Sequence, residues 1–277
     1  MVDTLVNGTP GDAISIHDRG LQFGDGVFET IAVQSGKLLC RDAHFTRLET
    51  GCRQLSITCP DRSLLEREAD RLCASLTSAV LKIIITRGMG GRGYQPPENI
   101  PANRILSVHR QPVYPSGYYR DGIDSYVCGR RISHQPELAG IKHLNRLEQV
   151  LLRREVTATP YPEGLVLDPQ DNVVEGSMSN IFMVKNAGLI TPDLSRCGVA
   201  GVIRRAIIEL DKAAGRDTAI RTIAREEIFE ADEVFYCNSV IGIWPVRRIG
   251  NKAFNSIDAG IEIMGKLISD NCIVPVS

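Results

Sequence analysis

The chain has 277 residues, which at roughly 150 residues per domain suits one large or two smaller domains. Hydrophobic residues make up 43% and charged residues 23%, as in an ordinary soluble globular protein, and the formal net charge is −1. So balanced a charge creates no global field that would attract nucleic acid or an anionic membrane. We therefore expect a small-molecule substrate or a second copy of the chain as partner, and no nucleic acid or membrane.

The sequence also argues against a metal site and against export. It contains eight cysteines, but none forms a C-x-x-C pair and no histidine–cysteine cluster has the spacing of metal ligands. The N-terminus lacks a basic region followed by an apolar run, and no stretch stays apolar for the roughly 20 residues that cross a bilayer. We expect a cytoplasmic, reduced protein without a bound metal.

Residues 1–115 predict a smaller N-terminal α+β domain. Residues 27–33 have strand composition, the turn signal at 34–37 follows, and residues 38–40 return as a second strand. A helix begins at residue 41 or 42, because apolar residues then recur at steps of three and four residues. The remaining expected elements are a helix over 63–75 and strands over 79–86 and 104–109.

Residues 111–120 carry two prolines and a glycine with little periodicity, which places a domain boundary there. Residues 116–277 then form a larger C-terminal domain in which strands and helices alternate. Its expected helices cover residues 144–156, 202–214 and 258–268, and its expected strands cover 164–168, 180–184 and 233–237. The fold class predicted for the whole chain is α+β or α/β in two domains.

Residues 88–93 (GMGGRG) match the G-x-G-x-x-G pattern of dinucleotide-binding proteins. That site requires a helix that begins at the loop, and the following residues YQPPE cannot open a long helix. We therefore reject nucleotide binding and expect a loop that carries Arg92 and Tyr94. Arg92 can present its planar fork to a carboxylate, or the segment is only a solvated surface loop.

Lysine is scarce, with seven lysines among 32 basic residues, and Lys142 stands between a loop and an expected helix with apolar neighbours. A lysine in an apolar pocket has a lowered pKa and can form a Schiff base, whereas one near a helix start commonly extends into solvent. Glu175 lies between an apolar pair and a turn of small residues. It is either a buried carboxylate with a cationic partner or an ordinary edge-of-sheet glutamate.

Three further positions could bind an anion. Arg47 lies on the polar side of its expected helix, and alone it would be taken for a surface arginine. Residues 198–203 (GVAGVI) open a helix whose backbone N–H groups can converge on an anion, unless they form a simple tight loop. Ser239, at a strand end, adds a hydroxyl. An anion cradle, an amine and a carboxylate are what a phosphate-bearing pyridine aldehyde needs.

These motifs together resemble the fold-type IV pyridoxal-phosphate enzymes, which include D-amino-acid and branched-chain aminotransferases and aminodeoxychorismate lyases. The matching stretches run through nearly the whole chain: residues 18–29 (DRGLQFGDGVFE), 44–48 (HFTRL), 175–182 (EGSMSNIF), 198–204 (GVAGVIR) and 231–235 (ADEVF). The resemblance implies the two-domain fold of the D-amino-acid-aminotransferase type and pyridoxal 5′-phosphate as cofactor.

The resemblance also implies roles for individual residues. Lys142 corresponds to the Schiff-base lysine, and Glu175 to the carboxylate that pairs with the pyridine nitrogen. The phosphate-binding positions correspond to Arg47, the backbone of Val202 and Ile203, and Ser239. Arg92 and Tyr94 become candidates for a substrate carboxylate. In this family the corresponding loop often reaches the neighbouring subunit's site, so a homodimer is implied.

The aminotransferases of this family usually carry a tyrosine five residues after the lysine, where this chain has Leu147. The stretches 139–149, 90–94 and 237–245 instead resemble the lyases. That branch converts 4-amino-4-deoxychorismate to 4-aminobenzoate and pyruvate in folate biosynthesis, and Thr30 then either protonates the leaving group or is a packing hydroxyl. The alternatives are an aminotransferase and a relative that has lost its chemistry, and the presence of Lys142 and Glu175 argues against the latter.

Overall fold

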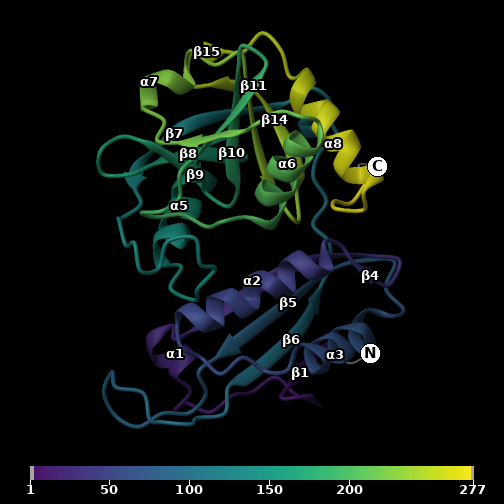
Figure 1. Cartoon of the computed structure of the whole chain (residues 1–277), viewed down its shortest axis with the longest axis vertical. Helices are drawn as coiled ribbons and strands as arrows, with labels where there is room; N and C mark the ends of the chain where they lie inside the picture. The colour runs from purple at the N-terminus through teal and green to yellow at the C-terminus, as the bar shows by residue number, and fades with distance from the viewer. Residues whose placement is uncertain (1–2, 276–277) are drawn as a thin grey trace. The chain divides into compact units, whose positions relative to one another are not determined.

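A computed structural model describes residues 3–275 of the chain (Figure 1). Contacts divide the chain into two compact units. The first unit comprises Met1–Pro112 with Ile141–Arg146, and the second comprises Val113–Gly140 with Leu147–Ser277. The division after Pro112 lies near the boundary expected at residue 115. The segment Ile141–Arg146, which we expected in the C-terminal domain together with Lys142, is grouped with the first unit.

The first unit is a six-stranded antiparallel sheet with helices α2 and α3 (Figure 1). The strands lie in the order β2-β1-β6-β5-β3-β4, and β3 and β5 pair without a register shift from Gly26–Thr86 to Gln34–Ser78. The strand bounds are Thr4–Val6 (β1), Thr9–Pro10 (β2), Gly26–Gln34 (β3), Lys37–Leu38 (β4), Ser78–Thr86 (β5) and Asn103–His109 (β6). The helices are Arg19–Phe23 (α1), Arg41–Gln54 (α2) and Arg62–Cys73 (α3).

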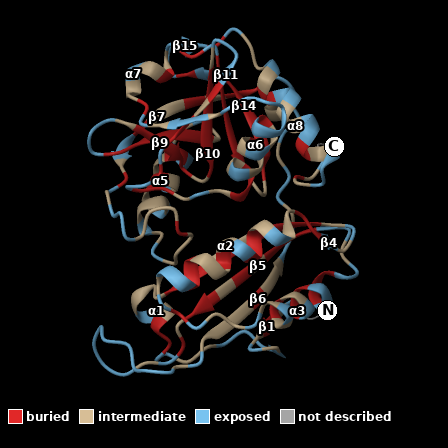
Figure 2. Ribbon diagram, in the orientation of Figure 1, coloured by how far each residue is buried: buried red, intermediate tan, exposed pale blue. Residues whose placement is uncertain are grey.

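The core of this unit lies between the helices and one face of the sheet. Along β3, Val27 and Ile31 are buried, whereas Phe28 and Thr30 on the alternate face are only half-buried. Phe45 and Leu48 of α2 belong to the same buried cluster as Val27 and Ile31. Figure 2 shows buried stretches, in red, on α2 and on the strands of this sheet. The expected helical and strand periodicities are therefore confirmed here.

The second unit is built on a nine-stranded mixed sheet (Figure 1). Eight strands follow the order β12-β11-β10-β13-β14-β7-β8-β9, and β15 pairs with β14. The pairs β7–β8, β7–β14 and β11–β12 are parallel, and the others are antiparallel. The strand bounds are Ile123–Arg131 (β7), Glu163–Leu167 (β8), Val173–Gly176 (β9), Asn180–Lys185 (β10), Gly188–Pro192 (β11), Ala219–Arg221 (β12), Glu233–Asn238 (β13), Gly242–Ile249 (β14) and Lys252–Ala253 (β15).

Five helices complete the second unit: Gly117–Arg120 (α4), Leu147–Thr157 (α5), Val202–Ala213 (α6), Arg225–Ile228 (α7) and Asp258–Ser269 (α8). The central strands β13 and β14 are buried almost throughout, with Tyr236 and Trp244 fully inaccessible. We expected β13 but not β7 or β14. The mixed α and β architecture in two units agrees with the fold class expected from the sequence.

The helix expected over residues 144–156 begins only at Leu147, so the expected start was wrong. The residues before it extend beside β3 instead. Phe28 N donates to Lys142 O at 2.9 Å, and Leu144 N donates to Gly26 O at 2.9 Å. Because these backbone groups are satisfied by a strand, they are not available to an earlier helical turn. No helix within residues 3–275 is long and apolar enough to span a membrane.

Candidate functional site

Lys142 is fixed by its backbone to the end of β3 in the first unit. An isolated bridge pairs its neighbour His143 with Val27, and Arg146 donates to the carbonyl oxygens of Ile141 and His143 at 2.7 and 2.8 Å. The side chain is half-buried, and its Nζ lies 4.4 Å from the centre of the Phe28 ring. An ammonium over an aromatic face is attracted by the ring quadrupole. The backbone around the lysine is therefore held beside β3 by hydrogen bonds, although Lys142 itself lies outside the regular strands.

Thr30 lies on the same face of β3 as Phe28, as strand alternation predicts. It is paired with Lys82 of β5, whose Nζ lies 5.5 Å from the Phe28 ring centre. Both lysines thus flank one aromatic ring in the first unit. This face combines two ammonium groups with a hydroxyl, a set that can hold anionic groups and move protons.

Arg47 does not behave as a simple surface arginine, because it is paired with Glu29. The Glu29 carboxylate is 1% exposed and accepts from Arg47 Nε at 2.7 Å and from Arg47 Nη2 at 2.6 Å. His44 Nδ1 lies 2.6 Å from the same carboxylate. Such bidentate pairing fixes the plane of the guanidinium.

Burial alone would raise the pKa of Glu29, but Arg47 and His44 outweigh it and lower that pKa to about 2. Burial lowers the pKa of His44. Glu29 is therefore ionised and His44 is assigned as neutral, with Nδ1–H donating to Glu29. Glu29 was not among the site residues predicted from the sequence. Its signal was a charged residue at a β3 position whose alternation predicts burial, one that needs a cationic partner.

In the second unit, Glu175 lies near the end of β9 and is 5% exposed. Its carboxylate accepts a hydrogen bond from the backbone of the glycine-rich loop before α6, residues 198–201. Its Oε2 accepts from Val199 N at 3.0 Å. Gly198, with φ of +87°, brings the chain so close that an added Cβ would lie 3.0 Å from Val174 and 3.3 Å from Glu175 Oε2. Only glycine fits this conformation and this approach without strain.

The same loop is fixed on its other side by Asn180 of β10. Asn180 Nδ2 donates to Val199 O at 2.8 Å, and an added Cβ on Gly201 would lie 1.9 Å from Asn180 Oδ1. Helix α6 begins directly after Gly201, so Val202 and Ile203 occupy its first turn. The amides of a first helical turn lack intrahelical acceptors and carry partial positive charge, which suits an anion.

Ser239 lies in the turn after β13, close to the turn that follows Glu175. The Asn238 side chain forms hydrogen bonds with the backbone of both turns. Its Oδ1 accepts from Val240 N and Ile241 N at 2.8 Å, and its Nδ2 donates to Met178 O at 2.9 Å. The loop 198–201, the Glu175 turn and the Ser239 turn are thus linked by hydrogen bonds within the second unit.

The expected site residues thus form two groups. Lys142, Thr30 and Arg47 belong to the first unit, as do Arg92 and Tyr94 on the exposed loop between β5 and β6. Glu175, Val202, Ile203 and Ser239 belong to the second unit. Leu147 is the first residue of α5 and is 70% exposed. Within the described residues 3–275, no cluster of three histidine, cysteine or acidic side chains could hold a metal ion.

Comparison with known proteins gives consistent matches over nearly the whole chain. The model of the family described as amino-transferase class IV matches residues 26–249. An aminodeoxychorismate lyase of Vibrio harveyi is 36% identical, with 96% of this chain and 98% of that protein covered. A putative branched-chain-amino-acid aminotransferase of Methanocaldococcus jannaschii is 30% identical, with 92% and 88% covered.

Solved structures agree. The crystal structure of 4-amino-4-deoxychorismate lyase from Pseudomonas aeruginosa has a TM-score of 0.93 and 43% identity, covering 98% of this chain and all of that one. The branched-chain amino acid aminotransferase of Escherichia coli shares the fold, with a TM-score of 0.83, 24% identity and coverage of 98% and 94%. The resemblance found in the sequence is confirmed. Since the family model spans most of its length, this chain belongs to the amino-transferase class IV family.

Proposed function

We propose that this chain is an aminodeoxychorismate lyase, which converts 4-amino-4-deoxychorismate to 4-aminobenzoate and pyruvate and so serves folate biosynthesis. One observation carries the proposal. The chain is 36% identical to the Vibrio harveyi protein and 43% identical to the Pseudomonas aeruginosa protein that bear this name, over nearly its full length, against 20% to 30% for the aminotransferases of the same fold. Fold alone does not separate the two activities, so the higher identity to the lyases is what decides.

The residues of both groups fit pyridoxal 5′-phosphate. The guanidinium of Arg47, fixed by Glu29, and the start of α6 both suit a phosphate, and Gly201 lets Asn180 hold the loop before α6 at a distance that a Cβ would not allow. The buried carboxylate of Glu175 suits a protonated pyridine nitrogen. The residues proposed to hold the cofactor are Arg47, Lys142, Glu175, Val202, Ile203 and Ser239.

When bound, the cofactor withdraws electrons from the substrate carbon that bears the amino nitrogen. Lys142 Nζ removes the proton from that carbon. The carboxylate of Glu175 would keep the pyridine nitrogen of the cofactor protonated. The enolpyruvyl C–O bond then breaks, the ring becomes aromatic, and the departing group takes up a proton to give pyruvate. Two roles stay open for Thr30: protonation of that leaving group by its hydroxyl, or packing.

The loop that carries Arg92 and Tyr94 is proposed to bind the substrate. Arg92 offers a planar fork of donors and Tyr94 a hydroxyl on an exposed loop, which suits a substrate carboxylate. A homodimer is proposed from the resemblance, since this loop often reaches the neighbouring subunit's site in the family. The cytoplasmic location expected from the sequence stays a prediction.

An aminotransferase is the second candidate, because the 30% identical relative bears that name. Leu147 stands where such enzymes usually carry a tyrosine, which favours the lyase. The test supplies the cofactor-loaded protein separately with enzymatically generated aminodeoxychorismate and with a panel of amino acids plus a keto-acid acceptor. The lyase forms 4-aminobenzoate from the first and little keto acid from the second. Keto acid without 4-aminobenzoate would overturn the proposal.

A further inference from the structure

The loop between β5 and β6, residues 87–102, carries Arg92 and Tyr94 and contains no helix. Its side chains are largely exposed, with Tyr94 85% accessible. An exposed loop of this length and glycine content would ordinarily sample many conformations. It packs, however, beside residues 17–25, which include the stretch DRGLQFGD that the proposed chemistry does not use.

The first turn of the loop is tied to this segment by backbone and capping groups. Arg19 N donates to Gly88 O at 2.9 Å, and Gly90 N donates to His17 O at 3.2 Å. Asp18 caps α1 and also accepts from Thr86 Oγ1 at 2.7 Å. These bonds fix where the loop leaves β5, but they do not reach the residues around Tyr94.

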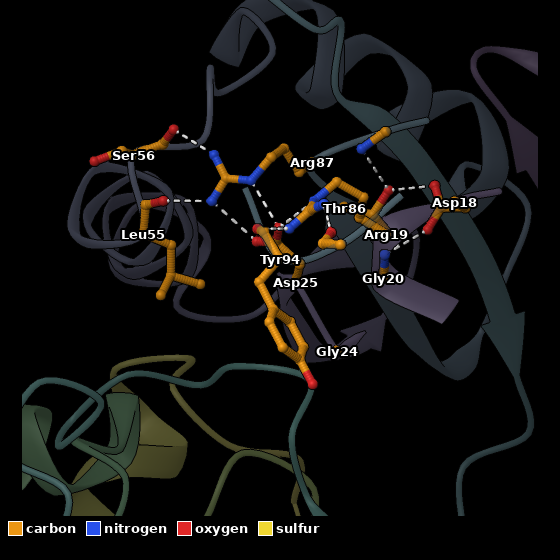
Figure 3. A network of polar contacts seen from close by, with 12 residues as sticks. Asp18, Arg19, Gly20, Gly24, Asp25, Leu55, Ser56, Thr86, Arg87 and Tyr94 are labelled. Atoms are coloured by element: carbon orange, nitrogen blue, oxygen red, sulfur yellow. Dashed lines mark hydrogen bonds and ion pairs between the residues drawn. The ribbon is translucent and has the colours of Figure 1, made fainter. Parts of the chain in front are cut away.

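The Arg19 side chain extends that support to the middle of the loop (Figure 3). It is 3% exposed, and its Nη1 and Nη2 donate to the carbonyl oxygens of Gly93 and Tyr94 at 3.2 and 2.6 Å. An added Cβ on Gly90 would lie 2.6 Å from Arg19 Cδ, so the loop also packs along the arginine stem. The Tyr94 ring lies 5.5 Å from that of Phe23.

Arg19 is itself held by Asp25, which also forms an ion pair with Arg87, directly after β5 (Figure 3). Asp25 Oδ2 accepts from Arg19 Nε at 2.9 Å and from Arg87 Nε at 2.7 Å. Arg87 also donates to the carbonyl oxygens of Leu55 and Ser56, at the end of α2, at 2.7 Å each. Burial would raise the pKa of Asp25, but the two arginines outweigh it and lower that pKa. A continuous chain of charge-assisted bonds therefore connects α2 with the loop.

We infer that Arg19 is a positioning residue that holds the loop so that Arg92 and Tyr94 meet the substrate carboxylate. The inference rests on the proposed function for those two residues. Three donors of one planar fork reach Asp25 and both loop carbonyls at once, which the single ammonium of a lysine cannot reproduce. Arg19 thus sets substrate binding without touching the reacting atoms.

The test compares Arg19→Lys and Arg19→Met with wild type, and uses Arg104→Met as matched control. Arg104 is another partly buried, ion-paired arginine of the same unit, bonded to Glu68 away from the loop. The first readout is tryptic cleavage after the exposed Arg92, below the unfolding temperature of every variant. We expect cleavage about tenfold faster in both Arg19 variants and unchanged in the control, because a released loop opens locally.

The second readout is kinetic. We expect the Arg19 variants to raise KM for aminodeoxychorismate about tenfold with kcat within about twofold of wild type, since only substrate binding is weakened. In an Arg92→Ala, Tyr94→Phe background, Arg19→Lys should raise KM little further, because both groups that Arg19 positions are gone. Unchanged cleavage would overturn the inference, as would faster cleavage with an unchanged KM or a loss confined to kcat. If wild type lacks lyase activity, the proposed function fails, while the cleavage result still decides whether Arg19 holds the loop.

Discussion

The two units prepare their candidate functional groups by different physical means. In the first unit, Arg47 is oriented by charge, through the buried carboxylate of Glu29 and its contact with His44. In the second unit, the loop before α6 is oriented by shape, because Gly198 and Gly201 let the backbone approach Glu175 and Asn180. The first arrangement should be sensitive to loss of a side chain, and the second to gain of one.

The largest effect is expected from Glu29→Ala. Removing the carboxylate leaves Arg47 and His44 without their shared partner in a buried environment, which costs about 3–5 kcal/mol of unfolding free energy. Glu66→Ala is the control, because Glu66 lies in a more exposed ion pair that should contribute less than about 1 kcal/mol. Denaturant unfolding of both variants measures the difference. Equal losses would show that the buried charge network has no special weight.

Gly201→Ala tests whether the loop before α6 depends on the close backbone approach that glycine allows. The new methyl group would lie 1.9 Å from Asn180 Oδ1, so the loop or the side chain must shift, at a cost of about 1–3 kcal/mol. Gly265→Ala, in α8 with nothing within 4 Å of the added Cβ, should instead be neutral or stabilise by up to about 1 kcal/mol. Thermal unfolding of the pair provides the comparison, and a harmless Gly201→Ala would refute the proposed role of the close approach.

A smaller, pH-dependent effect is expected at His143, beside Lys142. Burial, and then the charge of Arg146, lower the pKa of His143 to about 4. Below pH 6.5 the unfolded chain binds a proton that the folded chain does not, so stability falls as the pH drops from about 6.5 to about 4. Because the residue is only partly buried, we expect this loss to be roughly 1–2 kcal/mol.

The variant His143→Gln has no imidazole to titrate and should lose less stability over that pH range than wild type. Denaturant unfolding at several pH values between 4 and 7 makes the comparison. Identical pH profiles for the two proteins would mean that His143 is not held neutral by the fold.

The parts of the fold that follow from local pattern were predictable. In β3 and α2, apolar residues alternate or recur with the period of the element, because one face packs on a core and the other does not. Strands β7 and β14 were missed for different reasons. Five successive residues of β14 are buried, so it shows no alternation, while β7 begins shortly after residues 111–120, which were interpreted as a domain boundary.

For the candidate site, the motifs pointed to Lys142, Glu175 and the loop before α6, but their supports were not visible. The start of α5 was misplaced because the backbone after Lys142 bonds to β3, which lies more than 100 residues earlier in the chain. Arg19 and Glu29 act through contacts across 74 and 18 residues respectively, which local periodicity cannot reveal. Long-range hydrogen bonds, rather than composition, decide these positions.

The most direct test of the account is product stoichiometry in the cofactor-loaded wild type and in Lys142→Ala, both supplied with aminodeoxychorismate. We predict equal amounts of 4-aminobenzoate and pyruvate from wild type, and a rate at least about a thousandfold lower from the variant, because the amine that moves the proton is absent. Unequal products, or a variant as active as wild type, would contradict the assignment of Lys142 and of the lyase reaction.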